Sequence, residues 1–152
     1  MRKSMTVFIA LAVLAAGGAA WADTNTLTVQ ASVLGTCKFF SATSTLSFGA
    51  LDPSVGTDVS GSTTTNYWCT KGVTALITPG FGEHRVGTTR QMIDIGSGDF
   101  IPYALTLTGD PGTSAGPGSL RTLTITGNVV GTDYISKSAG GYSDTVLISL
   151  TP

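Results

Sequence analysis

Apolar residues in this chain recur with a period of two, in short runs, and not at helical spacing. No stretch of about a dozen residues places apolar side chains at i, i+3, i+4 and i+7. Short runs rich in Thr, Val, Ile and Leu alternate instead, and Gly, Pro, Asp and Ser separate them. This pattern predicts an antiparallel sandwich or barrel, because an α/β fold would need helical connections. The predicted strands are 27–34 continuing to Phe40, 45–51, 63–70, 73–79, 89–94, 100–108, 120–130 and 143–151.

The first predicted strand lies within DTNTLTVQASVLGTC (23–37) and alternates most regularly. Leu27, Val29, Ala31 and Val33 fall on one face, and Thr, Gln and Ser side chains fall on the other. A period of two over this length indicates a strand with one buried face. Packing within the same domain and packing on another molecule are both compatible with this pattern.

The first 22 residues have the features of a secretory signal peptide. Arg2 and Lys3 precede an apolar run, and small residues precede a cleavage point between Ala22 and Asp23. A retained membrane helix is the weaker alternative, because the apolar run is short and ends in glycines rather than in a basic flank. Removal of these 22 residues from 152 leaves 130, a length typical of one domain.

The charge of the exported chain excludes some partners. Loss of Arg2 and Lys3 leaves six of the eight Lys/Arg against nine Asp/Glu, a net charge of −3. A mildly acidic, charge-poor chain lacks the basic surface that binds nucleic acid. After cleavage no further apolar segment is long enough to cross a membrane, so we expect no integral membrane segment.

Cys37 and Cys69 are the two cysteines of the chain. An even number of cysteines in an exported protein predicts one disulfide, and two free buried thiols are the alternative. A closed loop of about 33 residues would stabilise the fold by roughly 3–4 kcal/mol in the chain-entropy description.

The one histidine, His84, lies in the Gly-rich sequence GFGEHRVG. Nothing nearby in the sequence fixes its ring between a nucleophile and a carboxylate, so a solvated loop histidine is the favoured interpretation. The acidic residues are scattered singly, and no GxSxG, GxGxxG or phosphate-loop motif is present. We therefore expect no catalytic residue and no enzymatic activity.

Asp94 and Asp99 flank Gly96-Ser97-Gly98. Carboxylates around glycines can bind calcium, but this segment lacks the acidic density of a calcium loop and fits a hairpin turn better. One histidine and a disulfide-bonded cysteine pair would provide no zinc site. We expect no metal and no cofactor.

Two aromatic pairs adjoin the cysteines, Phe39-Phe40 after Cys37 and Tyr67-Trp68 before Cys69. At least one member of each pair is expected in the core, and an outward ring that stacks on a sugar is the alternative. The expected exposed loops, which carry no core residue, are 51–61, 79–88 and 109–118.

Several motifs occur in a specific order along the exported chain. They are Thr45-Leu46-Ser47-Phe48-Gly49, Cys69, Arg90-Gln91-Met92, Ile101-Pro102-Tyr103-Ala104-Leu105, Gly127 and Gly141-Tyr142-Ser143-Asp144-Thr145-Val146. In this order the chain resembles the spore coat protein U domain family, which includes pilin subunits of archaic (Csu-type) chaperone–usher pili. Two departures are the ending in Thr151-Pro152 and the uncharged segment 109–122. The motif and core residues implied by the resemblance are Phe48, Arg90, Met92, Pro102, Tyr103, Tyr142 and Asp144.

The resemblance implies an all-β, incomplete immunoglobulin-like antiparallel β-sandwich that is completed by a donated strand. Residues 23–33 would be the donor-strand extension and residues 34–152 the sandwich domain. Leu27, Val29, Ala31 and Val33 would enter the groove of a neighbouring subunit. A periplasmic chaperone and an outer-membrane usher would be the transient partners, and identical or related pilin subunits the permanent ones. The expected product is a fimbrium at the cell surface that supports adhesion and biofilm formation, exported through the periplasm.

Three other functions remain open on the sequence alone. The first alternative is an adhesin or carbohydrate-binding module at a fibre tip, although such a subunit would need no donor segment. A spore or cyst coat component is a second alternative, since both coat and pilus proteins are exported and assemble. A small secreted hydrolase is disfavoured, because one loop histidine and no nucleophile motif are present.

Overall fold

The computed structural model describes residues 21–110 and 112–152. The predicted signal peptide therefore lies almost wholly outside the described residues. The chain divides into two units, and the division falls between Ser32 and Val33. In the first unit, residues 21–32 are exposed and form no strand.

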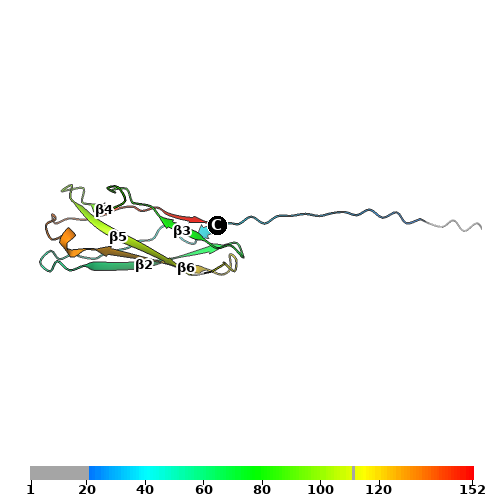
Figure 1. Ribbon diagram of the computed structural model, residues 1–152, viewed down its shortest axis with the longest axis horizontal. Coiled ribbons are helices and arrows are strands. Elements are labelled where there is room, and N and C mark those ends of the chain that lie inside the picture. The colour runs from blue at the N-terminus through cyan, green and yellow to red at the C-terminus, as the bar shows by residue number, and fades with distance from the viewer. Residues whose placement is uncertain (1–20, 111) are drawn as a thin grey trace, which may run out of the picture. The chain divides into compact units, whose positions relative to one another are not determined.

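The second unit, residues 33–152, is an all-β, immunoglobulin-like sandwich (Figure 1). One sheet has the strand order β1-β2-β6-β5-β4, and β3 pairs with β7 in the other; all neighbours are antiparallel. One 3-10 turn, η1, follows β6. The elements are β1 (Cys37–Phe39), β2 (Val59–Cys69), β3 (Leu76–Pro79), β4 (Arg90–Ile93), β5 (Phe100–Gly109), β6 (Arg121–Val129), η1 (Gly131–Asp133) and β7 (Ile148–Thr151).

The pairing of β2 with β6 forms the centre of the larger sheet. Its register runs from Val59 opposite Val129 to Tyr67 opposite Arg121. Both strands alternate, so Leu123 and Ile125 point into the core while side chains such as Ser62, Thr64 and Thr126 face outward. The alternation seen in the sequence is thus that of a sheet with one buried face.

The core has two clusters of buried residues. Tyr67, Cys69, Leu123 and Ile125 form the cluster toward β1 and β7. Ile101, Val129 and Tyr134 form the other, toward the β4–β5 turn. Burial of Tyr67 and partial burial of Phe39 agree with the prediction for the two aromatic pairs.

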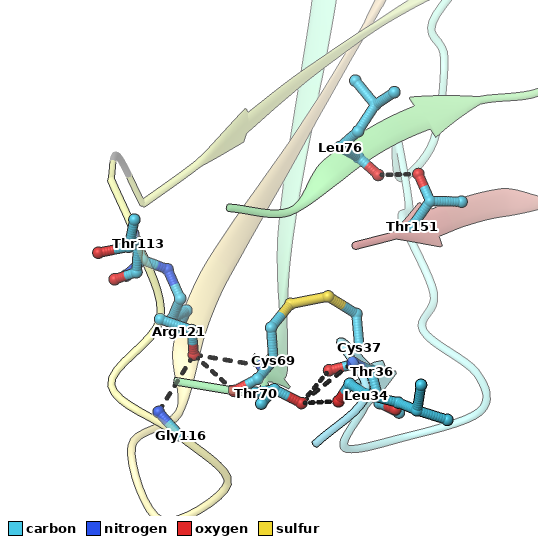
Figure 2. The surroundings of a disulfide bond; sticks show 11 residues. Leu34, Thr36, Cys37, Cys69, Thr70, Leu76, Thr113, Gly116, Arg121 and Thr151 are labelled. Atoms are coloured by element: carbon cyan, nitrogen blue, oxygen red, sulfur yellow. Dashed lines mark hydrogen bonds between the residues drawn. A yellow bond between two sulfur atoms is a disulfide. The ribbon is translucent and has the colours of Figure 1, made fainter. Parts of the chain in front are cut away.

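The predicted disulfide between Cys37 and Cys69 is present (Figure 2). The two residues are directly opposite in the β1–β2 pairing, with Cα atoms 4.0 Å apart. Thr70, the next residue, donates its hydroxyl hydrogen to the Leu34 carbonyl and accepts the Thr36 N–H. The start of the domain is therefore fixed to the end of β2 by one covalent bond and a hydrogen-bonded side chain.

Several predicted strand boundaries are wrong. Residues 27–34, 45–51 and 143–147 are in no strand, because they have no ladder partner, although an isolated bridge joins Ser143 to Ile93. Residues 59–61 were assigned to a loop but begin β2, because they pair with the end of β6. Side-chain alternation reports one buried face and does not report whether the backbone is paired.

The sequence predicts that the 109–118 loop carries no core residue, and this is wrong, because Ser114 and Gly116 are buried. The Ser114 hydroxyl donates to the Cys69 carbonyl at 2.9 Å and accepts the Cys69 N–H at 3.2 Å. The loop is therefore bound to the end of β2, because the hydroxyl satisfies two backbone groups beyond the ladder.

Candidate functional site

An open groove runs along the sandwich between two extended segments, residues 44–51 and residues 141–148. Three hollows of about 450, 160 and 530 Å³ follow one another along it. Leu46 lines all three hollows, so they form one continuous feature. The first hollow lies beside Phe39 and the last beside Tyr134.

The backbone in the middle of each groove edge is unpaired. In the described part of the chain, no backbone–backbone hydrogen bond involves residues 44–48 or 144–146. Side chains alternate along both edges: Leu46 and Phe48 face the groove on one side, as do Val146 and Ile148 on the other. Unpaired, extended edges present a row of N–H and C=O groups that can accept another strand.

The floor of the groove is mostly apolar at its centre. Met92 from β4, Leu105 from β5 and Ile125 from β6 line the central hollow, together with Thr63 from β2. Met92 and Ile101 line the hollow near Tyr134. An apolar floor between two unpaired edges matches an extended segment with one apolar face. The backbone of such a segment can hydrogen-bond to the edges, and its apolar side chains can pack on the floor.

A pair of glycines brings the first edge close to the sheet. Gly61 and Gly127 are directly opposite in the β2–β6 pairing. A Cβ at Gly127 would lie 2.7 Å from the Phe48 ring, and a Cβ at Gly61 would collide with the Ser47 carbonyl oxygen. The segment 46–48 can lie this close to the sheet only because neither position carries a side chain.

Asp144 anchors the second edge. Its side chain is 2% exposed and accepts a hydrogen bond of 2.6 Å from the Tyr103 hydroxyl. The backbone N–H groups of Glu83 and His84 donate to its other oxygen, and His84 Nδ1 lies 3.1 Å from that oxygen. These contacts join the 79–88 loop, β5 and the groove edge.

The contact with Asp144 corrects the prediction that nothing fixes the His84 ring. The two residues are 60 positions apart, so the contact has no signal in the local sequence. One carboxylate, one imidazole and one phenol lie together, but no serine, threonine or cysteine hydroxyl or thiol hydrogen-bonds to the imidazole among the described residues. The contacts of Asp144 are those of a structural anchor.

The electrostatics of this anchor follow from its hydrogen bonds. Burial opposes ionisation of Asp144, yet the hydrogen bonds from Tyr103, Glu83 and His84 hold its pKa below the usual value. Burial and the hydrogen bond to Asp144 raise the pKa of Tyr103. Asp144 is therefore a carboxylate, and Tyr103 a neutral donor, at any physiological pH.

The motif residues gather largely on the groove. Phe48, Met92, Tyr103, Tyr142 and Asp144 line its hollows. Arg90 lies outside them: its Nε donates to the Gly80 carbonyl at 2.8 Å, and its guanidinium lies 5.4 Å from the centre of the Phe81 ring. Pro102 lies opposite Gln91 in the β4–β5 pairing, also away from the groove.

Asp94 and Asp99 flank the β4–β5 turn, as the sequence predicted. The Asp94 carboxylate accepts hydrogen bonds from the N–H groups of Gly96 and Ser97 and from the Ser97 hydroxyl. Asp99 accepts the Ser138 N–H. The described residues contain no cluster of three or more potential metal ligands.

The apolar face of the N-terminal segment is in solvent. The exposed fractions of the side chains are 82% for Leu27 and Val29 and 86% for Val33, and Ala31 is also exposed. Leu27, Val29 and Ala31 belong to the first unit and Val33 to the second.

No helix in the described part of the chain has the length and hydropathy to cross a membrane.

Comparison with protein families places residues 23–149 in one match, to a family described as Spore Coat Protein U domain. The match covers most of the chain and includes both edges of the groove as well as the N-terminal segment. Comparison with curated proteins found no match.

Proposed function

The chain belongs to the Spore Coat Protein U domain family, and on this premise we propose that it is a structural subunit of a surface fibre assembled by donor-strand exchange. Proteins with this domain are pilus-type or coat-type surface proteins. The single observation that carries the finer proposal is the groove, with an apolar floor and two unpaired edges. The occupant would be residues 24–33 of the next subunit.

The size of the segment fits the groove. Leu27, Val29, Ala31 and Val33 are alternate residues, so they span about 20 Å at a rise of roughly 3.3 Å per residue. Each eight-residue edge extends for about 25 Å on the same basis. Burial of each larger side chain contributes roughly 1.5–3 kcal/mol, and the ladder hydrogen bonds add to this.

The attachment of the segment favours donation to a neighbour over folding back. Thr70 fixes Leu34 and Thr36 at the end of β2, and Gly35 adjoins Pro152. The chain's own segment would have to reverse direction just before Leu34 to enter its own groove, and would then run parallel to residues 143–151. A segment from a second copy can instead run antiparallel to residues 143–151, the more stable pairing.

The proposal includes the transient partners of assembly. An unfilled groove exposes apolar surface and unpaired edges, which favour aggregation. A periplasmic chaperone would cover the groove during export, and an outer-membrane usher would exchange that cover for the next subunit. No catalytic step is part of this role, and we propose that the protein is not an enzyme. At the cell surface the fibre would support adhesion and biofilm formation.

The decisive experiment changes one side chain on each face of the donor segment. Val29→Asp should abolish fibres, because a charge would have to enter an apolar groove. Thr28→Asp is the matched control, since Thr28 lies on the opposite face and would remain in water. Purified exported chains are compared for SDS-resistant multimers on unheated gels and for fibres in electron micrographs.

Trp68 fluorescence and the intact disulfide report whether each variant is folded. Residues 27–29 are exposed and lie outside the sandwich, so with the groove filled by excess synthetic peptide of residues 23–33 both variants should fold as the parent chain does. Fibres of normal length from Val29→Asp would refute the proposal. Loss of fibres with Thr28→Asp as well would assign the effect to charge and not to the apolar face.

A spore or cyst coat subunit is the second candidate, favoured by the family description itself. It would use the same groove, because a coat is also a polymer. Immunogold labelling of intact cells separates the two: thin surface fibres indicate a pilus, and a continuous layer indicates a coat.

A further inference from the structure

Most acidic residues of the sandwich lie at one end of the domain, and basic residues predominate at the other end. One end, the acidic end, contains the β4–β5 turn, the start of β2 and η1, opposite the marked C-terminus in Figure 1. Five carboxylates and one lysine lie there, a net charge of −4. They are Asp52, Asp58, Asp94, Asp99, Asp133 and Lys137.

The strand register and the hydrogen bonds establish this grouping. Asp58 precedes β2 and accepts the Gly131 N–H, next to η1. Asp99 precedes β5 and accepts the Ser138 N–H. A Cβ at Gly56, in the turn after Asp52, would contact Ile135. Segments far apart in the sequence thus meet at one end and contribute the same sign of charge.

The opposite end, the basic end, has the reverse balance. Lys38 lies in β1, Lys71 follows β2 and Arg121 begins β6, while Asp110 follows β5. The net charge is therefore +2. Between the ends, Arg85 and Arg90 balance Glu83 and Asp144, so the middle of the domain is close to neutral.

We propose that these two ends form a second contact surface between successive copies of this chain, with the acidic end of one copy against the basic end of the next. This inference rests on the proposed donor-strand polymer. With the donated strand antiparallel to residues 143–151, Val33 would reach the hollow near Tyr134, at the acidic end. In the donor subunit Thr70 hydrogen-bonds to the Leu34 carbonyl, so the basic end of the donor begins one residue after Val33.

The distances involved are short enough for the charges to act. A few extended residues span about 10 Å, at roughly 3.3 Å per residue. This is close to the screening length of about 8 Å at physiological ionic strength. The reverse orientation of the donated strand would bring two basic ends together, so the charge pattern independently favours the antiparallel arrangement.

Exposed apolar side chains lie among the charges at both ends. Val55, Ile95 and Ile135 are exposed at the acidic end, and Leu76 and Leu120 at the basic end. Protein interfaces combine apolar contacts with a polar rim, so exposed apolar side chains beside charges are compatible with a contact at each end. A contact between unlike ends is heterologous, so where the rotation between successive copies does not close a ring it gives a linear polymer of one polarity.

The test reverses one charge at each end and measures fibre growth by light scattering at about 20 mM and 300 mM salt. Lys71→Glu places a carboxylate against the acidic end and should slow growth at low salt by about three- to tenfold, because complementary charge chiefly raises association rates. Asp133→Lys leaves net charges of −2 and +2 at the two ends, whereas Lys71→Glu leaves no net charge at the basic end, so Asp133→Lys should slow growth less than Lys71→Glu does.

Arg85→Glu is the matched control, because it makes the same change in net charge in the middle of the domain. It should grow as the parent chain does at both salt concentrations. The difference between Lys71→Glu and the parent should shrink at high salt, since screening weakens exposed charge pairs.

Two outcomes overturn the inference and are distinguishable. If Lys71→Glu and Arg85→Glu grow at the same rate as each other at low salt, the charged ends are not in contact, and the donor-strand proposal still stands. If the parent chain forms no fibres, or Val29→Asp forms them normally, the donor-strand proposal fails and this inference fails with it.

Discussion

The close approach of the first groove edge to the sheet can be tested at Gly127. An alanine there would place its Cβ 2.7 Å from Phe48 Cζ and 3.1 Å from Leu46 Cδ2. Overpacking of this kind costs about 1–3 kcal/mol, and the reduced freedom of the unfolded chain returns less than about 1 kcal/mol. We expect Gly127→Ala to destabilise the domain by about 1–2 kcal/mol.

The measurement is the thermal unfolding of the disulfide-bonded chain, monitored by the fluorescence of Trp68. Excess synthetic peptide of residues 23–33 is present, so that the groove is filled in every sample. For a domain of this size, about 1–2 kcal/mol corresponds to a fall in Tm of roughly 4–8 °C. The variant should also form fewer fibres, because the Phe48 ring has to move into the groove. Gly118→Ala is the control: no atom lies within 4 Å of its Cβ position, so Tm should stay constant or rise slightly.

A second substitution separates the proposed contact from a general intolerance of the strand. Phe48→Leu removes the ring that the new Cβ would meet. The loss in free energy of unfolding caused by Phe48→Leu should therefore be smaller in the Gly127→Ala variant than in the parent chain. The reasoning is refuted if Gly127→Ala and Gly118→Ala unfold at the same temperature. It is also refuted if the two changes, Gly127→Ala and Phe48→Leu, are simply additive.

Two further predictions concern buried hydrogen bonds away from the glycines. Asp144→Asn should lower the free energy of unfolding by about 2–3 kcal/mol at pH 7, because it weakens charge-assisted hydrogen bonds from Tyr103 and the 83–84 backbone. The pKa of Asp144 is lowered in the folded state, so its contribution is complete above the unfolded pKa of about 4 and is lost as the pH falls through the lower folded value. In urea unfolding measured from pH 7 to pH 2, the free energy of unfolding should therefore decline less for the variant than for the parent chain. An equal decline with pH in the two chains would contradict this account. Ser114→Ala should cost about 1–3 kcal/mol in urea unfolding, because the buried N–H and C=O of Cys69 lose their partner. Ser119→Ala, at an exposed position, should be neutral, and equal effects of the two substitutions would contradict the account.

The sequence predicted the features that are encoded locally. Period-two alternation identified an antiparallel sandwich, and the central strands β2, β5 and β6 lie within a few residues of their predicted positions. Residue types around Asp94 predicted a hairpin turn, because Asp, Ser and Gly satisfy a turn backbone through their own side chains. The disulfide followed from the number of cysteines and the expected export.

Features that depend on tertiary contacts could not be predicted in the same way. Residues 45–48 and 144–146 alternate as strands do, but their backbone makes no backbone–backbone hydrogen bond, and alternation reports burial only. The contact of His84 with Asp144 joins distant segments. Gly127 is one of the motifs of the family resemblance, but no local feature explains it, and Gly61 lies in a segment predicted as a loop. Only the cross-strand register shows that both glycines serve the same close approach.

The balance between the core and the groove links folding to assembly. Few apolar side chains are fully buried in the described sandwich, and Leu46, Phe48, Met92 and Leu105 remain half-buried around the groove. Three donated side chains would contribute roughly 5–9 kcal/mol at about 1.5–3 kcal/mol each, before the loss of freedom on association is subtracted. This is comparable to the whole stability of a typical domain, about 5–15 kcal/mol. An unfilled sandwich would then be marginally stable, and insertion of the next subunit's segment would act as a folding step as well as a binding step.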